Sequence, residues 1–392
     1  MNIDNLIRTL CPEGVKRVRL GDCCKTITAP KRLDKKDYLT EGEYPIVDQG
    51  QKYIIGYTND ETALVPADKY VIFGDHTREI KYVDFSFAQG ADGVKILRAG
   101  NDIIPKFLYY AMANLEIPSR GYNRHWSIAK DLLLPLPPLP VQEAIVSYLD
   151  KLTSLTAELE AELELQKKRY DFYRNRLLSF APDPTTQFGA RLSNNATHHQ
   201  GNVSALVKWA KLGEIGRICM CKRILKSQTS TTGDIPFYKI GTFGKEPDAY
   251  ISKELYEEYK RLYSFPKKGT ILISAAGTIG KSVIYDGEPA YFQDSNIVWI
   301  DNDETIVLNK YLYYYYALKP WQISSGGTIQ RLYNDNIANT KIPLPPLSEQ
   351  ERIVGILDKY ETLVNDTRRG IPALINAVQR KYEYYRERLL TF

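Results

Sequence analysis

Few residues of this chain have the types and spacing that catalysis requires. The Gly-Lys-Ser triplet at 280–282 ends like a phosphate-binding loop, but Ala275 stands where that motif needs its first glycine. Asp75, Glu79 and Lys81 resemble a nuclease acid–acid–lysine cluster, yet the second half of the chain has no counterpart. There is no glycine-rich AdoMet loop and no Asn/Asp-Pro-Pro-aromatic motif, and the four histidines are scattered. The sequence therefore predicts a protein that is not itself an enzyme.

Positive charge is concentrated at matching places in the two halves of the chain. Segment 16–36 carries two acidic and eight basic residues, the latter being Lys16, Arg17, Arg19, Lys25, Lys31, Arg32, Lys35 and Lys36. The second half has Arg217, Lys222, Arg223 and Lys226 in the equivalent place. Lysine and arginine clusters of this kind contact DNA phosphates, which supplies affinity but reads no sequence.

Sequence reading needs planar side chains on loops, chiefly Arg for guanine and Asn or Gln for adenine. Each half has one such loop, RGYNRHW at 120–126 and GGTIQRLY at 326–333. Aligned, they place Asn123-Arg124 opposite Gln330-Arg331. A generic charged surface loop is the competing interpretation, but the paired occurrence favours DNA reading.

Composition bounds the class of protein. The 392 residues are 43% hydrophobic and 25% charged, with a net charge of +5, a pI near 8.6 and 29 tyrosines. That length favours two domains, and the mild positive charge permits a polyanionic partner. No apolar run reaches the ~18–20 residues of a membrane span, and the N-terminus has no signal layout, so we expect a soluble cytoplasmic protein. The five cysteines lack zinc spacing, which favours reduced structural thiols and no metal site.

The elements that carry these residues are repeated. Residues 135–151 read PLPPLPVQEAIVSYLDK and residues 343–359 read PLPPLSEQERIVGILDK, identical at 12 of 17 positions. KRYDFYRNRLLSF at 168–180 and RKYEYYRERLLTF at 380–392 share 7 of 13 positions. An internal duplication fixes the architecture, so the chain is one module made twice.

Each half begins with short β-like runs. Segments 44–48, 69–73, 84–88 and 94–98 are rich in Val, Ile, Tyr and Phe, and a helix is predicted at 105–114. The second half repeats the order, with 290–301 in place of 85–98 and a helix at 309–318. The framework matches while the intervening segments differ, as GDHTRE at 74–79 does from SAAGTIGK at 274–281.

A long helix follows each half. Residues 141–180 carry apolar or aromatic side chains at seven-residue steps with one exception, Gln166, and the second helix repeats the pattern up to Phe392. A sustained 3.5-residue period is typical of coiled-coil packing, although two unrelated amphipathic helices remain an alternative. Ser348 and Glu351 predict a capping box, Pro140 suits a first helical turn, and the PLPPL segments predict extended lead-ins that cannot continue a strand ladder.

Two segments should interrupt this regularity. The second helix contains Gly370-Ile-Pro372 and is four residues longer, so we expect a break or kink there. Residues 181–204, which include His198 and His199, are polar and rich in Pro, Gly and Asn, which predicts a flexible connector.

The duplicated LPLPPL-x-x-Q-E helix starts, the GTIGK loop at 277–281 and the Arg-x-x-Leu-Leu helix ends resemble HsdS, the specificity subunit of type I restriction-modification enzymes. TAEL at 156–159, followed by EAEL, resembles a short repeat of one branch of that family. The resemblance covers essentially the whole chain.

The resemblance implies an α+β fold with a pseudo-two-fold internal repeat: two similar globular target recognition domains, separated by two long antiparallel coiled-coil helices. The expected boundaries are 1–140 and 205–347 for the domains, 141–180 and 348–392 for the spacer helices, and 181–204 for the linker. Each domain would read half of a split double-stranded DNA site. Because the loops differ, the site should be asymmetric.

The resemblance also implies partners: two methyltransferase subunits, one on each side, and a separate ATP-driven subunit that translocates and cuts DNA. AdoMet, ATP and Mg would belong to those subunits, so no cofactor is expected on this chain. As DNA-binding candidates we select Lys25, Lys31, Arg32, His76, Arg78, Arg120, Asn123, Arg124, His125, Lys222, Arg223, Lys226, Ser274, Thr278, Lys281, Asn296, Gln330 and Arg331. As partner-binding candidates we select Pro137, Leu139, Gln142, Pro345, Leu347 and Gln350.

Three alternatives remain open at this point. One is the specificity subunit of a related two-subunit system that lacks a motor. A second is a DNA-modifying enzyme in its own right, which would need the missing motifs. The third is a coiled-coil scaffold or transport adaptor with no DNA role.

Overall fold

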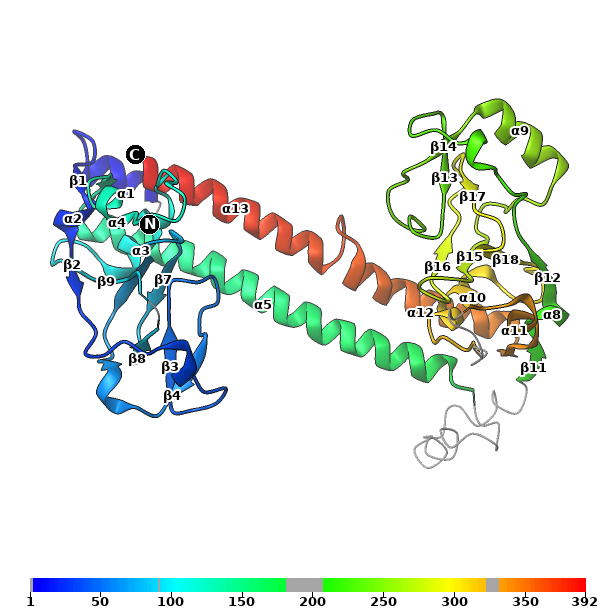
Figure 1. The fold of residues 1–392 in the computed structure, drawn as a ribbon, viewed down its shortest axis with the longest axis horizontal. Helices are drawn as coiled ribbons and strands as arrows, with labels where there is room; N and C mark the ends of the chain where they lie inside the picture. Colours follow the sequence, from blue (N-terminus) through cyan, green and yellow to red (C-terminus); the bar gives the residue numbers. More distant parts are fainter. Residues whose placement is uncertain (1–2, 91, 181–206, 322–330) are drawn as a thin grey trace. The chain divides into compact units, whose positions relative to one another are not determined.

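The computed structural model describes residues 3–90, 92–180, 207–321 and 331–392, which form two compact units (Figure 1). Unit 1 comprises Met1–Glu162 and Pro372–Phe392, and unit 2 comprises Leu163–Ile371. Each unit therefore contains one globular domain and parts of the long helices. The predicted connector at 181–204 and the candidate Gln330 lie outside the described residues.

Domain 1, the globular part of unit 1, is built on two four-stranded sheets. The first has the order β2-β9-β6-β7 and is antiparallel, with Cys24–Ile27, Val94–Ala99, Tyr70–Gly74 and Ile80–Val83. The second has the order β4-β3-β8-β5, with Gly56–Thr58, Tyr44–Val47, Phe87–Gln89 and Leu64–Val65, and its β3–β8 pair is parallel. A third pair joins β1 (Arg17–Arg19) to β10 (Leu133–Pro135). The remaining helices are α1 (Ile3–Leu10), α2 (Leu20–Cys23), η1 (Lys35–Asp37), η2 (Glu61–Ala63), α3 (Pro105–Ala113) and α4 (Trp126–Ala129).

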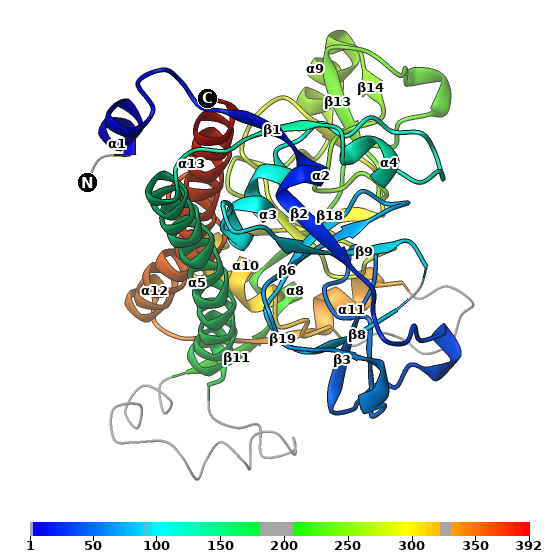
Figure 2. The ribbon, with the colours of Figure 1, turned by 90° about the vertical axis from the view of Figure 1, so that its left-hand side faces the viewer.

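Strand β6 is the centre of domain 1 because all five of its residues are buried. Its side chains alternate between two cores, as the period of two in a strand requires. Val71 and Phe73 pack into the cluster that contains Phe107 of α3, whereas Tyr70 and Ile72 pack into the cluster on the other face. Figure 2 shows β6, β9 and α3 together.

Domain 2, the globular part of unit 2, repeats this order. Its main sheet is β12-β18-β15-β16, with Gly216–Cys219, Ile297–Asn302, Ile271–Ser274 and Ser282–Ile284. A smaller sheet is β14-β13-β17, with Tyr250–Ile251, Ile235–Tyr238 and Tyr291–Phe292, and again one pair, β13–β17, is parallel. β11 (Lys208–Lys211) pairs with β19 (Lys341–Leu344). The helices are α8 (Leu212–Ile215), η4 (Lys226–Gln228), α9 (Lys253–Leu262), α10 (Asn309–Tyr316) and α11 (Asn334–Asn339).

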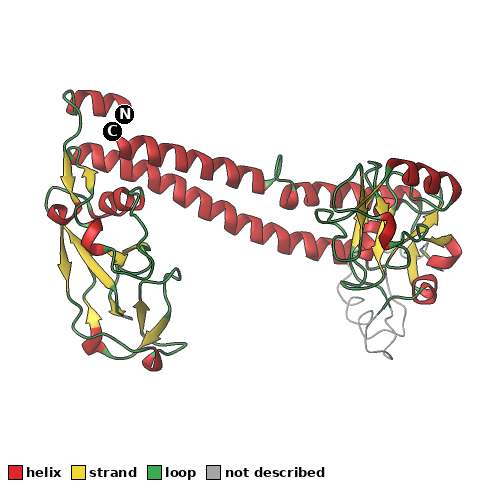
Figure 3. Cartoon of the chain, turned by 45° about the horizontal axis from the view of Figure 1, so that its top comes forward, coloured by secondary structure: helices red, strands yellow, loops and turns green. Residues whose placement is uncertain are grey.

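The long helices are α5 (Leu139–Leu178), α12 (Leu347–Asn365) and α13 (Ile371–Thr391), drawn in red in Figure 3. In unit 1 the beginning of α5 packs against the end of α13, with Tyr148 and Tyr385 rings 4.9 Å apart, so the two run antiparallel. In unit 2 the end of α5 packs against α12, where the rings of Tyr173 and Tyr360 stack at 5.5 Å. The mixed α and β content, the repeated domains and the long helices confirm the predicted fold class.

The predicted break in the second helix is confirmed at residues 366–370. Asp366 ends α12 and accepts hydrogen bonds from the backbone of Arg368 (2.7 Å) and Arg369 (3.2 Å). Gly370 is required there because a Cβ atom would lie 2.4 Å from the carbonyl oxygen of Thr362.

Two local predictions about the helix starts are wrong. Ser348 does not cap α12, because the helix begins one residue earlier, at Leu347. Pro135 and Pro343 also take part in strand ladders, opposite Arg17 and Trp209. The neighbouring hydrogen bond, Leu136 N–H to Lys16 O at 2.8 Å, places Pro135 at a position where an antiparallel ladder needs no N–H donor.

The two chain termini meet within unit 1. Asp4 of α1 forms an ion pair with Arg388 at 2.9 Å, and Arg17 donates to the carbonyl of Thr391 at 2.6 Å. Leu6 shares a core with Leu389 and Leu390. Helix α1 therefore packs against the C-terminal end of α13.

Candidate nucleic-acid interface

Three loops of domain 1 meet just beyond the end of β6. Backbone hydrogen bonds join Asp75 N–H to Gly93 O at 2.6 Å and His125 N–H to Asp75 O at 2.7 Å. The segments 75–79, 92–93 and 120–126 therefore form one surface. They carry the domain 1 candidates His76, Arg78, Arg120, Asn123, Arg124 and His125.

The 120–126 loop is anchored by two buried polar side chains, Asp75 and His125, which are 1% and 0% exposed. The Asp75 carboxylate accepts the N–H of Trp126 at 2.6 Å. His125 Nε2 accepts the N–H of Arg120 at 3.0 Å, so Nδ1 carries the proton and donates it to Asp75 O at 2.9 Å. His125 cannot reach DNA because both ring nitrogens are occupied inside the protein. Its selection as a DNA-contacting residue is wrong; it positions the loop.

The outer side of the same loop is exposed. Arg120, Asn123 and Arg124 face solvent, and the Asn123 amide donates to Arg120 O at 2.6 Å. Between them lies Tyr122, 84% exposed, whose ring stacks on His76 with centroids 4.7 Å apart and planes 13° apart. Sequence reasoning did not select Tyr122, although a tyrosine after a glycine at a loop tip was a usable signal.

An arginine–aspartate bridge occurs in both domains. Arg32 pairs with Asp92, and Arg223 pairs with Asp294 at 2.9 Å. Each arginine directly follows a lysine and lies a few residues after β2 or β12, an edge strand of the main sheet. Each aspartate lies just before β9 or β18, the strand that pairs with that edge strand. The bridge ties the basic segment to the loops beyond β6 or β15.

Domain 2 has the same backbone hydrogen bond that joins residue 125 to residue 75 in domain 1, but the side chains at the two positions differ. Leu332 N–H donates to Ala275 O at 2.8 Å, and Ala275 N–H donates to Asn296 O at 2.8 Å. Ala275 and Leu332 therefore occupy the places that Asp75 and His125 hold in domain 1. Arg331 donates to the carbonyl of Ser295 at 2.6 Å, which brings Arg331 and Asn296 to the same surface.

The GTIGK segment of domain 2 is a tight loop between β15 and β16. The Ser274 hydroxyl is buried, donates to Thr278 O and accepts the N–H of Lys281 at 2.9 Å. Lys281 Nζ donates to the carbonyl of Phe243 at 2.6 Å, while Thr278 is exposed. Ser274 is therefore a loop-shaping residue, and its selection as a DNA contact is wrong.

The other basic candidates lie on the exposed surface. Lys31 pairs with Asp60 at 2.6 Å, and this hydrogen bond lowers the pKa of Asp60 to about 2. Arg78 has a positive φ of 65° and donates to Ile117 O at 3.0 Å. The Lys222 ammonium lies 5.0 Å from the centre of the Tyr263 ring. Lys25 and Lys226 are also exposed.

The six partner-binding candidates divide into buried and accessible residues. Gln142 and Gln350 are 0% exposed, and their side-chain amides form hydrogen bonds inside the protein. Their selection as docking residues is therefore wrong. Pro137 and Pro345 are buried, Leu347 is half-buried, and Leu139 is 43% exposed.

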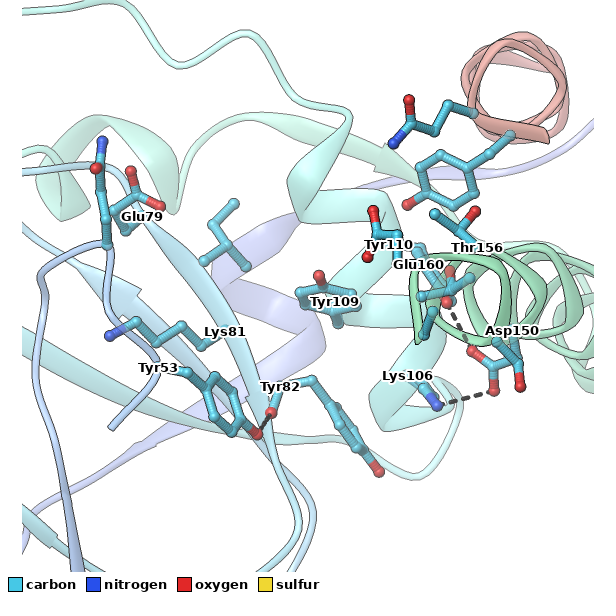
Figure 4. A pocket seen from close by; sticks show the side chains of 17 residues that line it. Tyr53, Glu79, Lys81, Tyr82, Lys106, Tyr109, Tyr110, Asp150, Thr156 and Glu160 are labelled. Carbon is cyan, nitrogen blue, oxygen red and sulfur yellow. Dashed lines mark hydrogen bonds and ion pairs between the residues drawn. The ribbon is translucent and has the colours of Figure 1, made fainter. Parts of the chain in front are cut away.

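A tyrosine-rich cavity of about 820 Å³ lies between domain 1 and the long helices of unit 1 (Figure 4). Asp150 of α5 accepts from the Tyr110 hydroxyl at 2.6 Å and pairs with Lys106 at 2.9 Å. Unit 2 repeats the cluster, since Lys310 pairs with Asp358 at 2.6 Å and Tyr314 donates to the same carboxylate. Because these polar groups satisfy one another, the cluster holds the domain on the helix.

Among residues 3–90, 92–180, 207–321 and 331–392, no group of three His, Cys, Asp or Glu side chains could hold a metal ion. Within the same ranges, no helix is long and apolar enough to span a membrane. The five cysteines are all free thiols.

The model of the type I restriction modification DNA specificity domain matches this chain twice, over residues 12–166 and 207–377. The chain belongs to this specificity family. A type I restriction enzyme specificity subunit of Haemophilus influenzae is 47% identical over 359 residues, which cover 87% of this chain and 86% of the relative. The EcoR124I/EcoR124II specificity subunit of Escherichia coli is 30% identical, with 96% and 94% of the two chains covered.

Solved structures of the specificity family share the fold. The S subunit of a type I restriction-modification system from M. genitalium superposes with a TM-score of 0.57 at 17% identity, covering 96% of each chain. A chain from a structure describing complex assembly and conformational transition of the type I system gives 0.58 at 20% identity, covering 96% of this chain and 98% of that one.

Proposed function

We propose that each domain of this specificity subunit reads one half of an asymmetric, bipartite double-stranded DNA site, and that the chain itself catalyses no reaction. One observation carries the proposal: the two domains share the same anchor and the same Arg–Asp bridge, but differ in the side chains around them. Asp75 and His125 in domain 1 are replaced by Ala275 and Leu332 in domain 2. Two domains with the same scaffold but different loop side chains would read two half-sites of different sequence.

The surroundings of the basic side chains suggest which of them bind phosphates and which of them read bases. Lys25 and Lys226 are exposed lysines that supply phosphate affinity without reading bases. Arg32 and Arg223 are oriented by their aspartate partners, which favours directional contacts of a planar guanidinium. The exposed Arg120, Asn123 and Arg124 are the base-reading candidates of domain 1.

The proposed partners are two methyltransferase subunits and a translocating, DNA-cleaving subunit, acting in the cytoplasm where they carry AdoMet, ATP and Mg. A docking place in unit 1 is the hollow of about 390 Å³ whose lining mixes apolar residues, such as Leu10, Pro138 and Leu139, with the charged Lys16 and Asp102. Leu10 and Leu139 are 40% and 43% exposed, and exposed leucines side by side favour a protein partner.

Mapping of adenine methylation in cells that express the chain with its methyltransferase tests this proposal. The expected result is one bipartite motif with two different half-sites, and its loss when the gene for this chain is removed. Methylation of DNA by the purified chain alone would contradict the non-catalytic assignment. Methylation without any bipartite motif would contradict the reading of two half-sites.

A further inference from the structure

The most exposed large side chain among the described hydrophobic residues is the ring of Tyr122, at 84%. It lies at the tip of the 120–126 loop, directly after Gly121, whose φ of +66° makes the turn. An aromatic ring in water at a loop tip contributes nothing to the core of the domain. Its position therefore needs an explanation outside the folding of domain 1.

The ring is held in place although it is exposed. One face of Tyr122 stacks on His76 at 4.7 Å, and the loop beneath it is fastened by the buried Asp75 and His125. The Asn123 amide closes the turn onto Arg120 O at 2.6 Å. Because these contacts fix the ring before any ligand arrives, binding against its open face costs little conformational entropy.

The backbone of His76, the other half of the stack, is also fixed. Its backbone N–H donates to the Gln49 side chain at 3.1 Å, and the Gln49 amide donates to Asp92 O at 2.8 Å. Gly93 packs so closely on the imidazole that a Cβ atom there would lie 2.5 Å from the ring. Asp92, whose carbonyl oxygen accepts from that Gln49 amide, also pairs with Arg32 through its carboxylate.

We infer that Tyr122, presented on His76, is a base-contacting and specificity-determining residue of domain 1, with Asp75 and His125 as positioning residues. The inference rests on the proposed function and names a residue that reads the first half-site. Its ligand is the apolar surface of a DNA base, such as a thymine methyl group or a base face at a deformed step, and not a phosphate. A phenol ring carries no positive charge, so phosphate affinity is left to the neighbouring arginines and lysines.

The test uses the full chain in complex with its methyltransferase and a DNA pool randomised in the first half-site, with the second half-site fixed. Tyr122→Ala should lower discrimination at one or two adjacent base pairs by roughly tenfold or more, the magnitude of one lost base contact. Tyr122→Phe, which keeps the ring, should retain the discrimination. The dependence of affinity on salt should stay unchanged, because no phosphate contact is removed.

A matched control is Tyr384→Ala, since Tyr384 is 57% exposed but lies on α13, outside the loops that carry the DNA-binding candidates. It should leave the first half-site preference intact. The melting temperature of Tyr122→Ala should stay within about 2 °C of the native value, as for other exposed side chains. A sharp fall in melting temperature would overturn the inference, because the ring would then be structural.

Two further outcomes separate this inference from the proposed function. If the native complex selects a sequence and Tyr122→Ala selects it equally well, or loses affinity for all sequences alike, only the role of Tyr122 is refuted. If the native complex itself selects no sequence, the proposed function falls, and the role of Tyr122 falls with it.

Discussion

Gln142 and Gln350 make the same three hydrogen bonds in the two units. The Gln142 side chain accepts the N–H of Ile104 at 2.8 Å and donates to Asp102 O (2.9 Å) and Pro137 O (2.8 Å). The Gln350 side chain accepts the N–H of Leu308 at 2.9 Å and donates to Ile306 O (3.1 Å) and Pro345 O (2.9 Å). Each glutamine therefore fastens the start of a long helix to the start of α3 or α10 and to the proline segment before it.

This relationship predicts that Gln142→Ala strongly destabilises unit 1. The substitution leaves one N–H and two carbonyl groups without their partner, and each buried unpaired group costs about 1–3 kcal/mol. We expect a loss of at least about 3 kcal/mol in the free energy of unfolding, measured by urea titration. Glu143→Ala is the control, because Glu143 is exposed and should change stability by less than about 0.5 kcal/mol. Equal stability of the two variants would refute the fastening role.

A second prediction concerns the anchor of the 120–126 loop. His125→Ala removes the hydrogen bonds to Arg120 N–H and Asp75 O, each worth about 1 kcal/mol, so the loop should open roughly tenfold or more as often. Trypsin should then cut faster after the exposed Arg120 and Arg124, which mass spectrometry of timed digests measures. Ser119→Ala, a change of an exposed side chain just before the loop, should leave both rates near the native values. Native cleavage rates in His125→Ala would show that the imidazole does not hold the loop.

A third prediction is a loss of stability at alkaline pH. Burial raises the pKa of Tyr311, Tyr314 and Tyr316, and for Tyr314 the nearby Asp358 and Glu361 carboxylates raise it further. A raised folded-state pKa stabilises the fold below the unfolded value near 10, and this contribution is lost as pH rises above it. The free energy of unfolding should fall above about pH 10, by up to about 1.4 kcal/mol per pH unit for each such tyrosine.

Urea titrations of native protein and Tyr314→Phe between pH 8 and 11.5 check this. Tyr314→Phe should fall less steeply above pH 10, because one linked proton is gone. Tyr333→Phe, which removes an exposed hydroxyl of the same unit, should follow the native curve. A native stability that stays flat through pH 11.5 would contradict the prediction.

The sequence predicted the regular framework well because the framework depends on local patterns. The run of β-branched and aromatic residues in Tyr70–Gly74 and the helical run at Pro105–Ala113 specify β6 and α3 without knowledge of distant residues. The break at 366–370 follows from Gly370 and Pro372 in the same way.

The misjudged residues share a physical cause. Gln142, His125 and Ser274 are polar types that sequence patterns assign to a surface, yet their partners come from distant backbone segments that only the folded chain brings near. Tyr122 was missed for the opposite reason: aromatic residues are usually buried, and the one sign of its exposure was its place directly after Gly121 in a polar loop. Burial of single loop residues depends on tertiary contacts, which no local pattern encodes.

The most direct test of the central claim is replacement of residues 15–134 by the corresponding segment of another member of the family. The methylation motif of the resulting complex is then mapped beside that of the native complex. We expect a new first half-site joined to an unchanged second half-site. A change in both half-sites, or in neither, would contradict the claim that each domain reads one half of the DNA site.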